Sequence, residues 1–465
     1  MARKPVSKST APSIQTWASR IAAAADLNDS RLNGRLADTL EVFARQPNDS
    51  IPQAAGNPHR AKAIYRFLAN DHFTFAPLIE AVARTTAAAC AGQDTVYLAH
   101  DSSSLNYSSL KATSGLGRIG KTEGAAGLLL HSALAIQADG IVCGLVHVDL
   151  WHRPEEKTKE QRHERPFEEK ESYKWVRGMQ AARVAFATLP EAKRPRLIHL
   201  MDREGDIHEV FADILAQGDG AVIRCSQDRK VAGAIDRAHA AVAASPRRGT
   251  TTLSVRDASG RAERQVLLEL RAIPVVLTPS HHEYPTHQSL SLHLLEAREV
   301  DPPPNSEPIH WYLWTTEPIA TLADICARLR EYAWRWRIEE YHLVLKSGCA
   351  TEQLQLETAE RLCKAIVLYA ATAARIVALR DLGRQAPDEP CTRVLNDEEW
   401  RVLAAYFDGN QSTPPTIRQA MLWLGRLGGH MGRKRDGLPG VRTLWRGWRD
   451  LALLISGYRA NARQR

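Results

Sequence analysis

Two acidic residues follow apolar segments that have the length and composition of β-strands. Asp101 follows Thr95–His100, and Asp202 follows Arg196–Met201. We therefore expect both aspartates at the C-terminal ends of strands, where α/β sheets commonly bind ligands. One acid at such a place is often only a turn residue. Two on neighbouring strands indicate a site for a hard divalent cation, Mg²⁺ or in its place Mn²⁺.

A third acid comes from a predicted helix. The segment that begins at Tyr332 has the sequence Tyr-Ala-Trp-Arg-Trp-Arg-Ile-Glu-Glu-Tyr-His-Leu-Val-Leu-Lys. At roughly 100° per residue, four of its side chains fall within an arc of about 60°: Tyr332, Arg335, Glu339 and Lys346. Glu340 points about 100° away from Glu339, so helical phase favours Glu339 as the third metal ligand. A surface stripe with an Arg335–Glu339 ion pair explains the same spacing equally well.

Three carboxylates beside basic residues suit phosphoryl transfer with two metal ions. One ion activates water or a 3′-hydroxyl as the nucleophile, and the other stabilises the leaving oxygen. Tyr332, Arg335 and Lys346 would then hold phosphates beside the metals.

The elements around these acids follow a defined order. The apolar patterns predict strand, strand, strand, helix, strand, helix and strand at 95–100, 128–138, 141–150, 170–187, 196–201, 207–216 and 221–225. Three antiparallel strands followed by parallel crossovers are typical of a ribonuclease H-like core. Short alternating segments at 226–310 indicate an all-β insertion in this α/β core.

Helical patterns dominate on both sides of the core. Near the N-terminus, apolar residues recur at helical spacing in four segments: 14–27, 31–45, 58–68 and 76–89. Asp29 is a plausible cap for the second of these helices. The helical pattern resumes at Leu322 and continues to the C-terminus.

Composition excludes several classes of protein. The 465 residues are 44% hydrophobic and 25% charged, as expected of a globular protein with more than one domain. The net charge is +8, and arginine is dense after Arg426, which suits a polyanion but also a solvated basic face. Seven cysteines without a CxxC pair argue against a disulfide framework or a structural zinc site and suit a reducing cytoplasm. No run of about 18 apolar residues predicts a membrane span.

Several segments together resemble the DDE superfamily of transposases. Tyr332, Arg335, Glu339 and Lys346 fit the Tyr-Arg-Glu-Lys signature of bacterial insertion-sequence transposases in the insertion-sequence-four group. Other segments resemble the family in the same order along nearly the whole chain: 64–70, 101–105, 169–175, 202–207, 426–431 and 444–448.

The resemblance implies a cut-and-paste DNA transposase. In this family water cleaves one strand at the transposon end, and the freed 3′-hydroxyl attacks the opposite strand to form a DNA hairpin. Water opens the hairpin, and the same hydroxyl then attacks target DNA. The resemblance makes Asp101, Asp202 and Glu339 the catalytic metal ligands, within a homodimer that holds two double-stranded transposon ends in the bacterial cytoplasm, at the nucleoid.

The resemblance also assigns DNA contacts. Trp311 would receive a base removed from the stack, since an aromatic face can bind it. Trp336 would fill the space that the base leaves, and Arg224 would lie near the DNA. Ordinary core packing is the alternative for each tryptophan. We accordingly expect a helical DNA-binding domain at 1–72, a catalytic domain at 73–372 and a helical dimerisation domain at 373–465.

Two other functions fit parts of the sequence. Gly115–Thr122 satisfies the Walker A pattern of a phosphate-binding ATPase loop. That motif needs a buried strand before it and a helix after it, whereas residues 106–114 are polar and Gly124 and Gly127 disfavour a helix. The second alternative is a catalytically silent regulator that occupies transposon ends without cutting them.

Overall fold

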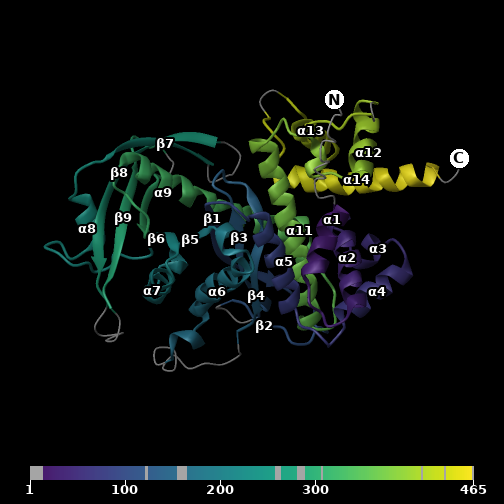
Figure 1. Cartoon of the computed structure of the whole chain (residues 1–465), viewed down its shortest axis with the longest axis horizontal. Helices are drawn as coiled ribbons and strands as arrows, with labels where there is room; N and C mark the ends of the chain where they lie inside the picture. The colour runs from purple at the N-terminus through teal and green to yellow at the C-terminus, as the bar shows by residue number, and fades with distance from the viewer. Residues whose placement is uncertain are drawn as a thin grey trace, which may run out of the picture.

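A large mixed sheet and two groups of helices make up the molecule in the computed structural model (Figure 1). The helices from the two ends of the chain pack together on one side, away from the far end of the sheet. The structure describes residues 14–120, 124–153, 165–256, 263–279, 288–304, 307–409, 412–433 and 436–462.

Five strands form the part of the sheet that carries the first two acids. They are β1 (Thr95–Asn106), β3 (Ala126–Ile136), β4 (Val142–Trp151), β5 (Arg196–Met201) and β6 (Gly220–Arg224). β3 pairs antiparallel with β1 and β4, whereas β1, β5 and β6 run parallel in that order. Two helices connect the parallel strands, α6 (Lys174–Ala187) and α7 (His208–Gln217). The element order predicted from the apolar patterns is therefore confirmed.

The segment predicted as a β insertion extends the same sheet. Beyond β6 the strand order is β10, β9, β8 and β7, each antiparallel to its neighbour. Their bounds are β7 (Gly249–Arg256), β8 (Glu263–Leu277), β9 (Leu290–Glu299) and β10 (His310–Thr315). The prediction of an all-β segment is wrong at α8 (Ala238–Ala243). This one-and-a-half-turn helix is too short for its periodicity to stand out in the sequence.

In the part of the chain that the structure describes, five helices precede the sheet. They are α1 (Ile14–Ala24), α2 (Ser30–Arg45), α3 (Ile51–Ala55), α4 (Pro58–Leu68) and α5 (Ala76–Ala89). The predicted cap is present, because the Asp29 carboxylate accepts the backbone N–H of Arg31 at 2.8 Å. The sequence analysis missed the short α3, which begins at a Ser50 capping box and ends at Gly56 in the left-handed region.

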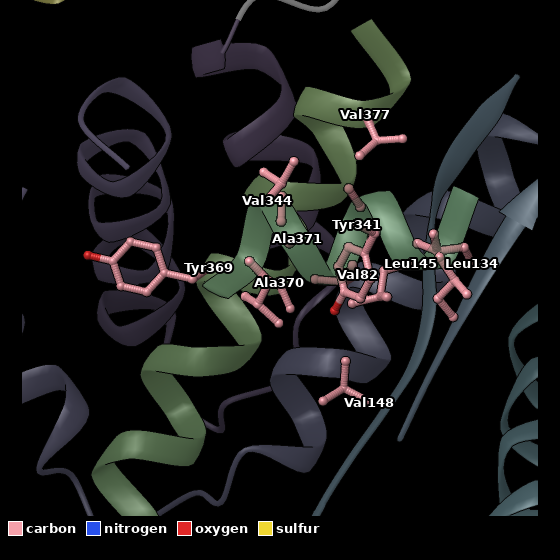
Figure 2. Packing of buried hydrophobic residues seen from close by; sticks show 14 of the residues in the cluster. Val82, Leu134, Leu145, Val148, Tyr341, Val344, Tyr369, Ala370, Ala371 and Val377 are labelled. Carbon is pink, nitrogen blue, oxygen red and sulfur yellow. The ribbon is translucent and has the colours of Figure 1, made fainter. Parts of the chain in front are cut away.

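The helix α11 (Ala359–Gln385) joins the sheet to the helices at both ends of the chain. Figure 2 shows the apolar packing around it, with Tyr369 on the side of the N-terminal helices and Leu134 and Leu145 on the side of the sheet. Among the described helices, α11 alone is long and apolar enough to cross a membrane. However, 89% of its most apolar window is buried inside the protein, as in the core helix of a globular fold.

Three further helices follow α11, and two of them cross at glycines. They are α12 (Asp397–Phe407), α13 (Ile417–Leu427) and α14 (Val441–Ala462). A Cβ added at Gly428 would lie 1.9 Å from the carbonyl oxygen of Thr443, and one at Gly447 would lie 1.8 Å from that of Leu424. The two backbones therefore touch directly, which explains why small residues recur in this basic part of the sequence.

The Walker A pattern lacks the structural context of an ATPase loop. Lys121 and Thr122 lie outside the described residues. Turns precede Gly115, the two-residue strand β2 (Gly117–Arg118) lies within the motif, and from residue 124 onward the chain enters β3 at Ala126 rather than a helix. No helix N-terminus is thus placed to bind a phosphate in the described part of this loop.

Candidate active site

Asp101 and Asp202 lie at corresponding positions on neighbouring parallel strands. The last pair between β1 and β5 is Ala99 with Leu200, and the same register continued by two residues sets Asp101 beside Asp202. Adjacent strands are roughly 5 Å apart, and every second side chain points to the same face. The two carboxylates therefore share one face and one edge of this pairing.

The prediction that Asp101 ends its strand is wrong. β1 continues to Asn106 because its polar residues after Asp101 pair with β3, up to Asn106 with Gly127. Composition alone made this serine-rich stretch look like a loop, but a partner strand supplies its backbone hydrogen bonds. Only the pairing of β1 with β5 ends near Asp101, at Ala99 with Leu200. Asp202 directly follows β5 and caps a short 3-10 turn, where its Oδ1 accepts the backbone N–H of Glu204 at 2.9 Å.

The helix that carries Glu339 is interrupted twice. α9 (Leu322–Trp334) ends before Arg335, α10 (Trp336–Leu343) begins after it, and residues 344–348 form a π-helical turn. The prediction of one continuous α-helix through this region is therefore wrong. Because a π turn contains more residues than an α turn, the calculated arc does not apply to Lys346.

Arg335 lies between two of the predicted metal ligands. Its Nη2 is 2.6 Å from Oε1 of Glu339, and its Nη1 is 3.9 Å from Oδ2 of Asp101. The guanidinium is buried, with 8% of the side chain exposed, whereas 44% of the Glu339 side chain is exposed. His342 approaches the same carboxylate, with Nδ1 3.8 Å from Oδ2 of Asp101. Burial lowers the pKa of His342 to about 3, so this ring is neutral and Arg335 is the cation at Asp101.

The electrostatics of the site show an excess of buried negative charge. The pKa of Asp101 is raised to about 7, chiefly by burial and also by the nearby Asp202 and Glu339, while Arg335 acts against them. Burial also raises the pKa of Asp202. Burial acts to lower the pKa of Arg335, but Tyr332 and the carboxylates of Glu339 and Asp101 outweigh it and raise that pKa. The Arg335 guanidinium contacts Glu339 and Asp101, and Lys174 adds a positive charge near Asp202.

These acids have the donor chemistry of a site for a hard cation, because Mg²⁺ and Mn²⁺ prefer carboxylate oxygens. A cation would also relieve the repulsion that raises the pKa of Asp101. Across the described ranges, however, no three His, Cys, Asp or Glu side chains are grouped closely enough to hold a metal ion. At this site the Glu339 carboxylate binds Arg335 instead. Metal binding by all three acids would require the Glu339 side chain to move closer to the two aspartates.

The predicted DNA-binding residues form a chain of rings and guanidinium groups. The Trp311 and Tyr332 rings meet edge to face at 5.4 Å, with Arg224 6.0 Å from the Trp311 ring and Arg335 5.9 Å from the Tyr332 ring. Trp311 is only 7% exposed, because its ring packs in the hydrophobic core against Tyr332. Its face is therefore not open to a base in this conformation.

Trp336 and Lys346 are more exposed to solvent than Trp311. Trp336 is 47% exposed, at the first position of α10. Lys346 is half-buried in the π turn, and its charge contributes to the low pKa of His342. Lys346 thus approaches the site from the side of His342.

Glu340 turns away from the site into a buried ion network. Its two carboxylate oxygens each lie 2.6 Å from a nitrogen of Arg380 on α11. Arg380 also contacts Asp381 at 2.7 Å, and Asp381 contacts Arg337 at 3.4 Å. This network fixes the rotation of α10 against α11, and with it the direction of the neighbouring Glu339.

Sequence reasoning missed two residues beside the acids. His342 follows Glu339 by less than one helical turn, a spacing that could have indicated it. Lys174 lies in the segment 169–175 that resembles transposases, and its buried ammonium contacts Glu204 in the turn after Asp202. No pattern in the sequence alone links Lys174 to Asp202.

Two protein-family models match the chain, one near each end. Residues 14–73 match the model described as transposase DNA-binding. Residues 371–464 match the model described as transposase Tn5 dimerisation domain. The chain carries transposase domains at both ends.

The two matches support a transposase similar to that of Tn5, one that binds DNA and forms homodimers. The first match covers α1 to α4, and the second covers the later part of α11 together with α12, α13 and α14. The acids of the candidate site lie between the two matched segments. The candidate site is therefore flanked in the sequence by a segment that matches a DNA-binding model and a segment that matches a dimerisation model.

Proposed function

We propose that the protein is a cut-and-paste DNA transposase of the DDE superfamily, in the insertion-sequence-four group. One observation carries the proposal: Asp101 and Asp202 hold matched positions on adjacent parallel strands, and Arg335 joins Glu339 to Asp101. This acidic cluster lies between the two transposase segments in the sequence.

The strand order supports a ribonuclease H-like core for this enzyme. The order β4, β3, β1, β5, β6, with the first three strands antiparallel and the last three parallel, is the arrangement that the sequence analysis expected of such a core.

Asp101, Asp202 and Glu339 would hold Mg²⁺, or Mn²⁺ in its place. The bound cations supply activation of the attacking oxygen and stabilisation of the leaving oxygen. Release of Glu339 leaves the Arg335 guanidinium without its closest partner. A DNA phosphate is the natural replacement, because a guanidinium binds phosphate oxygens in a bidentate manner. Arg335 would thus exchange a carboxylate for substrate as the site fills.

The proposed reaction has four phosphoryl-transfer steps at each transposon end. Water cleaves the first strand, the released 3′-hydroxyl attacks the opposite strand to form a hairpin, water opens the hairpin, and the same hydroxyl attacks target DNA. Tyr332 and Lys346, with Arg335, would hold the phosphates in place. Trp311 would receive the extruded base once its face is uncovered, and Trp336, already exposed, would fill the gap in the duplex.

Incubation of the purified protein with labelled duplexes that carry candidate terminal repeats, in Mg²⁺, tests the proposal. We expect nicked products first, hairpin-ended products next and strand transfer into added target DNA last. Asp202→Ala should remove all three while leaving the binding of the duplex unchanged. A protein that binds the repeat tightly but never nicks it in Mg²⁺ or Mn²⁺ would instead be a silent regulator of transposon ends.

A further inference from the structure

A buried ammonium group lies beside the turn that carries Asp202. Lys174 is the first residue of α6, and only 8% of its side chain is exposed. Its Nζ lies 3.2 Å from Oε2 of Glu204, and 5.9 Å and 5.7 Å from the ring centroids of Trp151 and Trp175. Lysine is rarely buried unless it is paired. The only carboxylate within ion-pair distance of Lys174 in the described residues is that of Glu204, whose own side chain is 65% exposed.

Glu204 connects this ammonium to the Asp202 carboxylate. The side chain of Glu204 contacts Lys174, while its backbone N–H donates to Oδ1 of Asp202 at 2.9 Å. Residue 204 is thus held at both its side chain and its backbone. The ion pair thus anchors the turn whose backbone N–H donates to the Asp202 carboxylate.

We propose that Lys174 is a positioning residue for Asp202, acting through Glu204 to hold that carboxylate in the orientation that binds the divalent cation. The inference rests on the proposed function, because it assigns Asp202 as a metal ligand. Outer contacts of this kind orient the groups that bind the metal, and their loss typically lowers metal affinity or activity by about 10–100-fold.

Three variants and one matched control test this role. Lys174→Met keeps the length of the side chain without the charge, Lys174→Arg keeps the charge, and Glu204→Gln removes the partner charge from a mostly exposed position. Arg177→Gln is the control: Arg177 lies on the next turn of α6 and pairs with Asp149 at 2.6 Å. Each protein is measured for Mn²⁺ affinity by electron paramagnetic resonance on its DNA complex, for the Mg²⁺ concentration that half-saturates cleavage, and for unfolding temperature.

We expect Lys174→Met and Glu204→Gln each to weaken Mn²⁺ binding by about tenfold and to raise the half-saturating Mg²⁺ concentration in parallel. The double variant should be no worse than either single one, because both remove the same contact. Lys174→Arg should return to within about threefold of the wild type, and Arg177→Gln should match the wild type throughout. If Lys174→Met does not fold, Glu204→Gln, at the exposed end of the pair, gives the same answer.

Unchanged Mn²⁺ affinity in both Lys174→Met and Glu204→Gln would overturn the inference. It would also be overturned if Arg177→Gln lost as much Mn²⁺ affinity as these two variants. A lower unfolding temperature with unchanged metal dependence would make Lys174 purely structural. Wild-type protein that binds Mn²⁺ but never cleaves would refute the proposed function while the affinity measurements still decide the role of Lys174. Wild-type protein that neither binds Mn²⁺ nor cleaves would overturn both.

Discussion

Replacement of Asp101 by asparagine should stabilise the metal-free protein, and increasingly so as the pH rises. Burial and the neighbouring acids raise the pKa of this carboxyl from 3.8 to about 7. An acid whose pKa is raised on folding favours the folded state while it is protonated, and that advantage is lost as the pH climbs through the folded pKa. Asparagine has nearly the shape of the protonated acid and never acquires the charge.

The magnitude follows from the pKa difference. About three pKa units at about 1.36 kcal/mol each set a ceiling of about 4 kcal/mol on the cost of ionising Asp101 in the folded state. Part of that cost is already present at about pH 5, because the unfolded carboxyl is ionised there. Between about pH 5 and about pH 8 the advantage of Asp101→Asn over the wild type should therefore grow by at most about 2.5 kcal/mol.

Urea unfolding followed by tryptophan fluorescence, in a chelating buffer at both pH values, measures this difference. Addition of Mg²⁺ should then shrink it, because only the wild type keeps the full set of metal ligands and is stabilised by binding. Asp94→Asn is the control, since Asp94 is exposed and should show no pH-dependent gain. An Asp101→Asn advantage that does not grow with pH would refute the conclusion that uncompensated negative charge gathers at this site.

Other substitutions test the remaining contacts. Glu339→Ala should abolish strand cleavage on labelled DNA with a modest loss of stability, because the buried Arg335 keeps Asp101 as its remaining carboxylate. Glu340→Ala should lower the unfolding free energy by about 1–3 kcal/mol without abolishing cleavage, because it removes one of the two carboxylates that contact the buried Arg380. Equal effects on both properties would contradict their separate roles. Trp311→Ala should slow hairpin formation more than first-strand nicking in a gel time course; equal slowing would remove its role as base platform. Gly447→Ala should force α13 and α14 apart, lower stability by about 1–3 kcal/mol and weaken the dimer in sedimentation experiments. Gly457→Ala, at an open position of the same helix, should raise stability by up to about 1 kcal/mol, and a loss there equal to that of Gly447→Ala would contradict the steric explanation.

Sequence alone determined the features that depend on local pattern. The apolar runs predicted β5 residue for residue and placed α4 and α5 correctly, because the spacing of buried positions is set by the repeat of the element itself. The same logic separated Glu339 from Glu340, since helical phase points them in different directions, and Glu340 indeed turns to Arg380. The spaced signature in this helix also led to the transposase resemblance that the two family matches support.

Tertiary contacts decided what local pattern could not. β1 continues past Asp101 only because β3 lies beside it to supply hydrogen bonds, so composition placed the end of the strand too early. The bond between Arg335 and Glu339 was foreseeable from spacing, but burial of the guanidinium against Asp101 required a strand and a helix that are distant in sequence to meet. No pattern in the sequence predicts the contact from Lys174 to the turn after Asp202. Local periodicity predicts neither the direction in which α6 runs nor the burial of the Lys174 ammonium. The pKa values in a site depend on which charged groups are buried next to one another, and only the tertiary structure decides which groups these are.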